Sequence, residues 1–239
     1  MRMRHHLAAG FLLSAVACAS ACGRNAEAPV AGAPASTRTA PPREQPSGRP
    51  AVAADTRPRV VFLGDSITAG LGLAPDQAYP ALIQQRLDAE GLAYQVVNAG
   101  VSGDTSAGGL SRLDWALEGD VRMLVVALGG NDGLRGLPAV ELRKNLASII
   151  ERARARQIQV VLAGMEAPPN FGQDYTVSFR QVYPDVSRQY GVPLIPFLLQ
   201  GVAGIEGLNQ RDGIHPTAEG ARTVADNVWT VLRPALKGS

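Results

Sequence analysis

The sequence contains very little cysteine and very little histidine. Of its 239 residues, only 2 are cysteines and 3 are histidines. Both cysteines, Cys18 and Cys22, lie near the N-terminus, so the rest of the chain can form neither a disulfide nor a thiolate metal site. His5 and His6 belong to the same N-terminal segment. Any histidine chemistry in the remaining chain therefore depends on His215.

Charged and aromatic residues are also sparse. Charged residues make up 18% of the chain and aromatic residues 5%, and the formal net charge is +2. Surfaces that bind nucleic acids usually combine clustered Lys and Arg with aromatic rings on which bases stack. We therefore expect no nucleic-acid partner.

The N-terminus resembles an export signal, predicted here for residues 1–21. A basic start is followed by an apolar stretch that is rich in Ala and Leu and too short to span a membrane. Ala19-Ser20-Ala21 fits ordinary signal-peptide cleavage, which would give a soluble periplasmic protein. Residues 19–23 also resemble a bacterial lipobox without its usual leucine, in which Cys22 would carry the lipid. We favour the membrane-anchored lipoprotein, because a chain with no later cysteine has little other use for a cysteine at position 22.

Residues 22–57 are predicted to form a disordered tether. Their composition shifts to Ala, Pro, Ser, Thr and Gly without apolar periodicity. Thirty-odd such residues reach at least about 30 Å, although an exported N-terminus with no spacing role is the alternative. Residues 58–237 remain as one domain, whose size allows burial of roughly 70% of its unfolded surface.

Short apolar runs alternate with helical patterns along this domain. The runs are rich in β-branched residues and do not alternate between apolar and polar residues, as in strands covered on both faces. They cover residues 59–63, 94–97, 123–128, 159–163 and 192–195. Apolar residues at helical spacing fill the intervals and continue to residue 232. The alternation predicts an α/β fold with a five-stranded parallel sheet, helices on both faces and right-handed crossovers.

Four polar, glycine-containing segments follow the predicted strands. They are Gly64-Asp65-Ser66, Asn98-Ala99-Gly100, Gly129-Gly130-Asn131-Asp132 and Asp212-Gly213-Ile214-His215-Pro216. The carboxyl ends of parallel strands share one edge of the sheet, and the functional loops of such folds lie there. We expect these four segments to meet at that edge.

Ser66, His215 and Asp212 are the residue types that nucleophilic catalysis requires. A serine hydroxyl needs a base within hydrogen-bond reach, and the base needs a third group that fixes its tautomer. Imidazole exchanges its proton near neutral pH, and Asp212 can fold back on His215 within one turn. Each residue alone is explained more simply, as a helix cap, a turn residue or a satisfied histidine. Their joint occurrence at strand ends favours a hydrolase.

Acyl transfer also needs hydrogen-bond donors for the developing oxyanion. The backbone N–H groups of Ser66 and Gly100 and the side-chain amide of Asn131 are candidates. A tight turn at Gly100 and a loop-closing hydrogen bond at Asn131 are the structural alternatives. Asp65 and Asp104 are interpreted as structural, holding the nucleophile turn and capping the following helix.

In order and spacing, the four segments resemble the conserved blocks of the SGNH (GDSL) hydrolases. Residues 101–106 and 133–136 narrow the resemblance to the periplasmic thioesterase, arylesterase and lysophospholipase group. The resemblance spans about residues 59–235 and implies a flavodoxin-like three-layer α/β/α sandwich with no metal or organic cofactor.

The same resemblance assigns roles to individual positions. It implies that Ser66 is the nucleophile and that His215 acts first as general base and then as general acid. Asp212 would orient His215, and Ser66, Gly100 and Asn131 would form the oxyanion hole.

Apolar residues beside the predicted loops indicate an acyl groove, although core packing explains some of them equally well. The candidates are Leu134, Leu137, Pro168, Phe171 and Ile214. The leading hypothesis is an exported, monomeric serine esterase or thioesterase. It would act through an acyl-enzyme on aryl and short-to-medium acyl esters and on lysophospholipids, and would touch a membrane only through Cys22.

Two alternatives stay open. A carbohydrate acetyl esterase would keep the mechanism but would present more Trp, Tyr and Asn around its site. A non-catalytic ligand-binding lipoprotein is supported by the fold alone, because Ser66 and Thr68 form no glycine-rich phosphate cradle.

Overall fold

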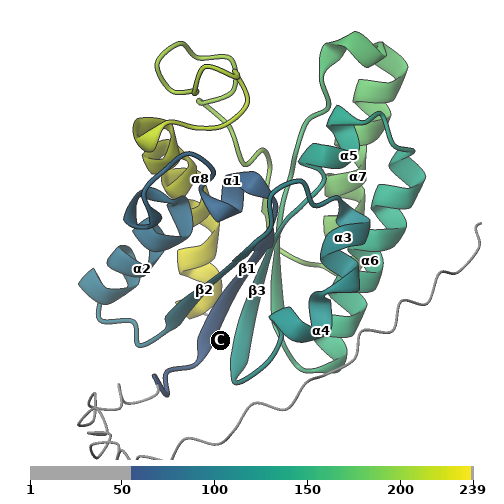
Figure 1. The fold of residues 1–239 in the computed structure, drawn as a ribbon. Coiled ribbons are helices and arrows are strands. Elements are labelled where there is room, and N and C mark those ends of the chain that lie inside the picture. The colour runs from purple at the N-terminus through teal and green to yellow at the C-terminus, as the bar shows by residue number, and fades with distance from the viewer. Residues whose placement is uncertain (1–54, 238–239) are drawn as a thin grey trace, which may run out of the picture. The chain divides into compact units, whose positions relative to one another are not determined.

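Five parallel strands form the centre of the computed structural model, which describes residues 55–237 (Figure 1). They are β1 (Arg59–Gly64), β2 (Gln95–Gly100), β3 (Val121–Ala127), β4 (Gln159–Ala163) and β5 (Leu194–Ile195). Their order in the sheet is β2-β1-β3-β4-β5. The predicted α/β fold with a five-stranded parallel sheet is confirmed. The predicted signal peptide, Cys22 and the tether up to residue 54 lie outside the described residues.

Helices cover both faces of this sheet. They are α1 (Ser66–Ala69), α2 (Tyr79–Ala89), α3 (Ser106–Ser111), α4 (Leu113–Ala116), α5 (Gly130–Leu134), α6 (Ala139–Ala155), α7 (Gln173–Tyr190) and α8 (Ala218–Lys237). Short 3-10 turns occupy Pro75–Gln77 and Pro169–Phe171. Helices α1, α2 and α8 lie on one side of the sheet, and α3 to α7 lie on the other (Figure 1). The arrangement is the three-layer α/β/α sandwich.

The long helices bury the apolar stripes that their sequences contain. In α8, Val224, Val228 and Leu232 recur every four residues and are fully buried. In α6 the equivalent stripe includes Leu142 and Leu146. Each such side chain contributes roughly 1.5–3 kcal/mol by leaving water. No helix within residues 55–237 is long and apolar enough to cross a bilayer.

Strand β2 differs from the prediction that every strand is covered on both faces. It is an edge strand with a single neighbour, β1. Residues 95–97 are half-buried and Asn98 is exposed, whereas β1 is fully buried from Val60 to Leu63. Apolar composition alone does not distinguish an edge strand from a central one, because both pack against helices.

The strand register brings two predicted segments side by side. Gly64 at the end of β1 pairs with Gly100 on β2 and with Ala127 on β3. A Cβ atom added to Gly100 would lie 2.3 Å from the backbone nitrogen of Ala69. Glycine at this position therefore allows the second strand to end directly against the first turn of α1.

Candidate active site

Ser66 is the first residue of α1 and lies two residues after the end of the interior strand β1. The preceding residue, Asp65, caps the helix, because its Oδ1 accepts a hydrogen bond of 3.0 Å from the backbone N–H of Ile67. The helix ends after one turn at Gly70, whose φ of 76° is left-handed. The N–H groups of a first helical turn have no intrahelical acceptor, so that of Ser66 is available to a ligand.

Ser66, His215 and Asp212 form a continuous chain of hydrogen bonds. The His215 Nε2 atom lies 2.8 Å from the Ser66 Oγ atom, across 149 residues of sequence. The His215 Nδ1 atom lies 2.7 Å from the Asp212 Oδ2 atom. The fold therefore places the predicted nucleophile, base and orienting residue in the geometry that their roles require.

Asp212 is held in its ionised form. Its Oδ1 accepts hydrogen bonds from the backbone N–H groups of Ile214, at 3.0 Å, and His215, at 3.1 Å. The Ile214 hydrogen bond, followed by those from the ring and the backbone of His215, lowers the pKa of Asp212 to about 2. An ionised carboxylate at Nδ1 keeps the ring proton on that nitrogen and leaves Nε2 free to accept a proton from serine.

The predicted oxyanion donors occupy different surroundings. The Gly100 N–H donates to the Asn98 side-chain oxygen at 2.9 Å. The Asn131 side-chain amide donates to the backbone oxygen of Asp104 at 3.0 Å. This is a loop-closing hydrogen bond, the structural alternative to an oxyanion role for Asn131. Ser66 and Asn131 line the cavity that opens at the site, whereas Gly100 is not among its lining residues.

Asp65 is buried directly behind Ser66, with 3% of its surface exposed. Burial raises the pKa of Asp65 to about 6, against lowering contributions from the Ile67 hydrogen bond and from His215. The prediction that Asp65 holds the nucleophile turn agrees with its capping of α1. The prediction that Asp104 caps the next helix is wrong, because Thr105 is the N-cap of α3 and its side chain accepts from Gly108 at 3.2 Å.

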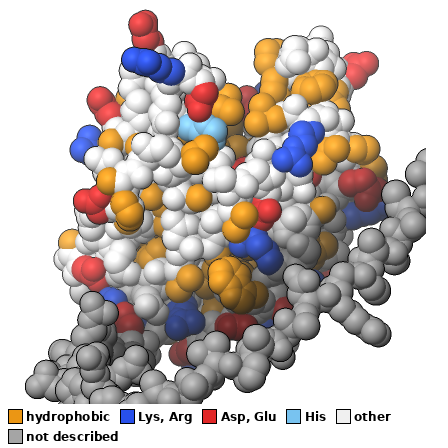
Figure 2. Space-filling model, viewed as in Figure 1, with side chains coloured by type: hydrophobic (Ala, Val, Ile, Leu, Met, Phe, Trp, Pro, Cys, Tyr) orange, Lys and Arg blue, Asp and Glu red, His pale blue; other side chains and the backbone are white. Residues whose placement is uncertain are grey.

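A cavity of about 320 Å³ opens at Ser66 and His215. Figure 2 shows a hollow in this face of the molecule, with apolar side chains gathered along both sides. Of the predicted acyl-binding residues, Leu134, Pro168 and Ile214 line the cavity. Leu137 and Phe171 are not among the lining residues, and the Phe171 ring packs instead 5.5 Å from that of Tyr175.

Sequence reasoning missed seven of the lining residues. They are Ile67, Glu166, Ala167, Phe197, Leu199, Ala203 and Asn209. Phe197 and Leu199 follow β5, so the rule that places strand ends at the functional edge would have found them. Most of the cavity wall away from the catalytic loops is apolar, and Glu166 and Asn209 add polar groups to it.

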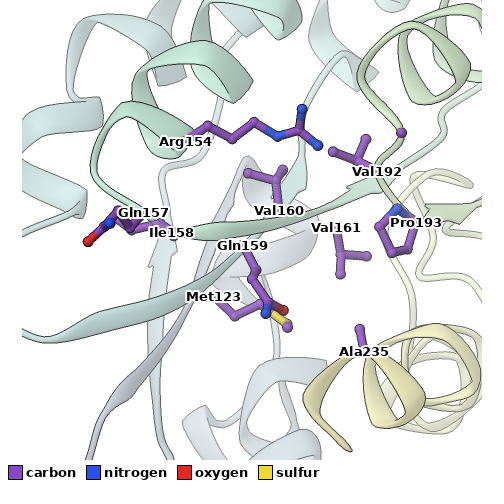
Figure 3. Close-up of a pocket in the computed structure, with 11 residues that line it drawn as sticks. Met123, Arg154, Gln157, Ile158, Gln159, Val160, Val161, Val192, Pro193 and Ala235 are labelled. Atoms are coloured by element: carbon purple, nitrogen blue, oxygen red, sulfur yellow. The ribbon is translucent and has the colours of Figure 1, made fainter. Parts of the chain in front are cut away.

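A second cavity, of about 340 Å³, lies at the amino ends of β3 and β4 (Figure 3). Met123, Val160, Val192 and Pro193 line it, together with Arg154. No serine, histidine or carboxylate is among its lining residues. Within residues 55–237, no three His, Cys, Asp or Glu side chains are placed to share a metal ion.

Residues 62–223 match the model of the GDSL-like Lipase/Acylhydrolase family. The chain belongs to this family. Esterase TesA of Pseudomonas aeruginosa is 48% identical over 178 residues, which cover 74% of this chain and 89% of that protein. The Escherichia coli protein named thioesterase 1/protease 1/lysophospholipase L1 is 36% identical over 187 residues, or 78% of this chain and 87% of that protein.

Solved structures show the same relationship. The crystal structure of TesA matches with a TM-score of 0.71 at 47% identity, covering 74% of this chain and 98% of that one. Esterase EstA from Pseudoalteromonas, in a structure inhibited by monoethylphosphonate, matches with a TM-score of 0.71 at 30% identity over 75% of this chain and 98% of that one. The protein is therefore an enzyme of the GDSL hydrolase family with the SGNH fold.

Proposed function

We propose that the protein is an exported serine esterase acting on aryl and short-to-medium acyl esters, and also on acyl thioesters and lysophospholipids. The observation that carries the proposal is the hydrogen-bonded chain from Asp212 through His215 to Ser66, which ends at an apolar cavity. Similar proteins named esterase, thioesterase 1/protease 1/lysophospholipase L1 and arylesterase support the substrate class.

The first half of the reaction makes an acyl-enzyme. The Ser66 Oγ atom attacks the acyl carbonyl carbon while its proton moves to His215 Nε2. The carbonyl oxygen becomes an oxyanion, which the Ser66 N–H and the Asn131 amide, both at the cavity, stabilise. The imidazolium then gives its proton to the leaving alcohol or thiol as the bond to the acyl carbon breaks. Ionised Asp212 stabilises the imidazolium during this step.

The Asn131 amide carries two N–H donors, so it can bind the oxyanion and keep its 3.0 Å hydrogen bond to the Asp104 carbonyl. Its longer contact, 3.4 Å to the Asp65 Oδ2 atom, is the one that substrate binding would exchange. The third predicted donor, Gly100, does not line the cavity and its N–H is bonded to the Asn98 side-chain oxygen, so the proposed mechanism does not use it. Donors held in place before the reaction stabilise the transition state without a further cost of ordering.

The second half releases the acid. A water molecule gives a proton to His215 and attacks the acyl carbon, and the returning proton restores the Ser66 hydroxyl as the acyl–oxygen bond breaks. The steps use side-chain and backbone groups of this chain and one water molecule, and the atoms balance as ester plus water giving acid plus alcohol.

The cavity favours an acyl group over a sugar. Leu134, Pro168 and Ile214 would contact the acyl chain, and the volume of about 320 Å³ lies within the range of small-molecule sites. Neither Trp nor Tyr is among the lining residues, although an acetylated sugar would normally stack on such rings. This composition supports the esterase over the carbohydrate acetyl esterase.

Export and anchoring are proposed from the N-terminal sequence. A basic start, an apolar stretch and Cys22 in a lipobox-like context support a periplasmic, lipid-anchored enzyme. We propose that it acts as a monomer. Metabolic labelling with palmitate should mark the full-length protein and not the Cys22→Ser variant. An unlabelled wild-type protein in the periplasmic fraction would leave export without the anchor.

Hydrolysis of a chromogenic butyrate ester by the purified protein tests the proposed activity. We expect Ser66→Ala to lose about 10⁴- to 10⁶-fold in kcat, by analogy with other serine triads. Ser178→Ala is the matched control, because Ser178 is an exposed serine on α7 whose hydroxyl, within residues 55–237, bonds only the Tyr175 backbone oxygen at 2.9 Å. Equal rates for wild type and Ser66→Ala would reject the proposal.

A further inference from the structure

Arg112 lies between α3 and α4 and holds two loops of the site. Its Nε donates to the Asp104 Oδ2 atom at 2.6 Å, and its Nη2 donates to the Gly64 backbone oxygen at 2.9 Å. The ion pair is largely buried, with 17% of the Arg112 side chain and 18% of the Asp104 side chain exposed. Screening by solvent is weak for such a pair, unlike for a surface ion pair.

Both acceptors of Arg112 belong to segments that carry proposed catalytic groups. Gly64 is two residues before Ser66 and also accepts the backbone N–H of Val101 at 3.0 Å. Asp104 offers its backbone oxygen to the Asn131 amide at 3.0 Å. One guanidinium group therefore joins the nucleophile turn to the loop against which the oxyanion donor Asn131 rests.

The charge of Arg112 is as important as its contacts. Asp65 lines the cavity, and Asp104 contacts the Asn131 amide through its backbone oxygen, so both carboxyl groups belong to segments around the proposed oxyanion hole. Burial is the main cause of the raised pKa of Asp65, and the charge of Asp104 adds a small contribution in the same direction. An unneutralised carboxylate at Asp104 would oppose the negative charge of the transition state.

Hydrogen bonding alone does not explain the choice of arginine here. The Arg112 Nη1 atom is buried and has no hydrogen-bond partner within the described part of the chain. A buried donor without an acceptor is unfavourable for stability. An arginine that leaves one of its amino groups unpaired therefore indicates that the position uses its charge and its two other contacts.

We propose that Arg112 is a positioning residue of the esterase reaction, which neutralises Asp104 and fixes the Gly64 and Asp104 loops around the oxyanion hole. The inference rests on the proposed function. Its signature is a loss in kcat at unchanged KM, because Arg112 does not line the cavity that receives the acyl group.

The experiment measures kcat and KM on the butyrate ester for full-length variants. We expect Arg112→Met to lower kcat about 10- to 100-fold with KM within two-fold of wild type. Adding Asp104→Asn to it should recover at least three-fold in kcat, because the unpaired charge disappears with its counterion. A kcat for Arg112→Met within two-fold of wild type, or no recovery in the double variant, would overturn the proposal.

Arg112→Lys is the second variant, in case Arg112→Met does not fold. A lysine keeps the charge but cannot make both contacts, so we expect kcat to fall about three- to ten-fold at unchanged KM. A kcat equal to that of wild type would overturn the positioning role.

Arg152→Met is the matched control. Arg152 also pairs with an aspartate, Asp114, at 2.6 Å and donates to a backbone oxygen, that of Leu110, at 3.4 Å, but away from the site. We expect its kcat to equal that of wild type. If Ser66→Ala is inactive and Arg112→Met is unchanged, only this inference fails. If Ser66→Ala matches wild type, the proposed function fails and this inference fails with it.

Discussion

The two ends of the parallel sheet hold cavities of similar size and different chemistry. The carboxyl end has about 320 Å³ at Ser66 and His215, and the amino end has about 340 Å³ beside Arg154 (Figure 3). Both cavities have apolar walls. Only the carboxyl-end cavity has a hydroxyl bonded to an imidazole, and only there does a lining carboxyl group, Asp65, have a shifted pKa.

This difference follows from the direction of the strands. Loops at the carboxyl ends of β1 and β3 begin helices α1 and α5, so free N–H groups and helix caps collect there. At the amino end of β4 the chain arrives from α6, which ends at Ala155 and is followed by Gln157 with a φ of 60°. A cavity becomes a candidate active site through its polar groups and not through its volume.

The largest effect that separates the two ends is expected at Asp212. Asp212→Asn removes the carboxylate that fixes the His215 tautomer, and we expect a loss of about 10⁴-fold in kcat. Arg154→Ala at the amino end should leave kcat unchanged, and steady-state kinetics on the butyrate ester measures both. A comparable loss in the two variants would mean that the site is not confined to the carboxyl end.

A smaller effect is expected when one cavity is filled. Ala203 lies at the exposed side of the carboxyl-end cavity, so Ala203→Phe shortens the space for an acyl chain without replacing a core residue. We expect the ratio of laurate to butyrate ester hydrolysis, in kcat/KM, to fall about ten-fold. Ala235→Phe adds the same ring at the amino-end cavity and should leave the ratio unchanged. An equal ratio in the two variants would show that the acyl chain does not bind in the proposed cavity.

The smallest effect concerns stability and pH at Asp65. Because the pKa of Asp65 is raised from 3.8 to about 6 in the folded protein, its stabilising contribution is complete below about pH 4 and is lost as the pH rises through 6. Asp65→Asn does not titrate. The free energy of unfolding of Asp65→Asn minus that of wild type should therefore increase by up to roughly 3 kcal/mol from pH 4 to pH 7.5.

Urea unfolding at the two pH values measures this gain. Arg154→Ala is the control at the other end of the sheet, because a guanidinium does not titrate in this range. If the difference in free energy of unfolding between Asp65→Asn and wild type is the same at both pH values, the pKa of Asp65 is not raised on folding.

Local patterns predicted most of the fold. Strand β4 was predicted to cover residues 159–163, and the structure has the same bounds. The edge position of β2 was not predicted, because strand order depends on crossovers that apolar composition does not encode. Strand β5 is shorter than predicted and begins at Leu194, since Pro193 has no N–H to donate to the sheet.

The site was predicted less completely than the fold. Ser66, His215 and Asp212 meet as expected, because each follows a strand end or shares a turn. Arg112 was not predicted, since it lies between two helices and reaches the site through its long side chain. Phe171 was expected at the cavity from its sequence position, but its ring packs toward Tyr175 on α7.

The central claim is that Ser66 forms a covalent acyl-enzyme at the carboxyl end of the sheet. Mass spectrometry of the protein inhibited by a phosphonate ester tests it most directly, because the phosphorus atom stays bonded to the attacking oxygen. We expect one adduct per molecule, on the peptide that contains Ser66, and none in Ser66→Ala. Complete inhibition with the adduct on another residue, or with no adduct at all, would contradict the account.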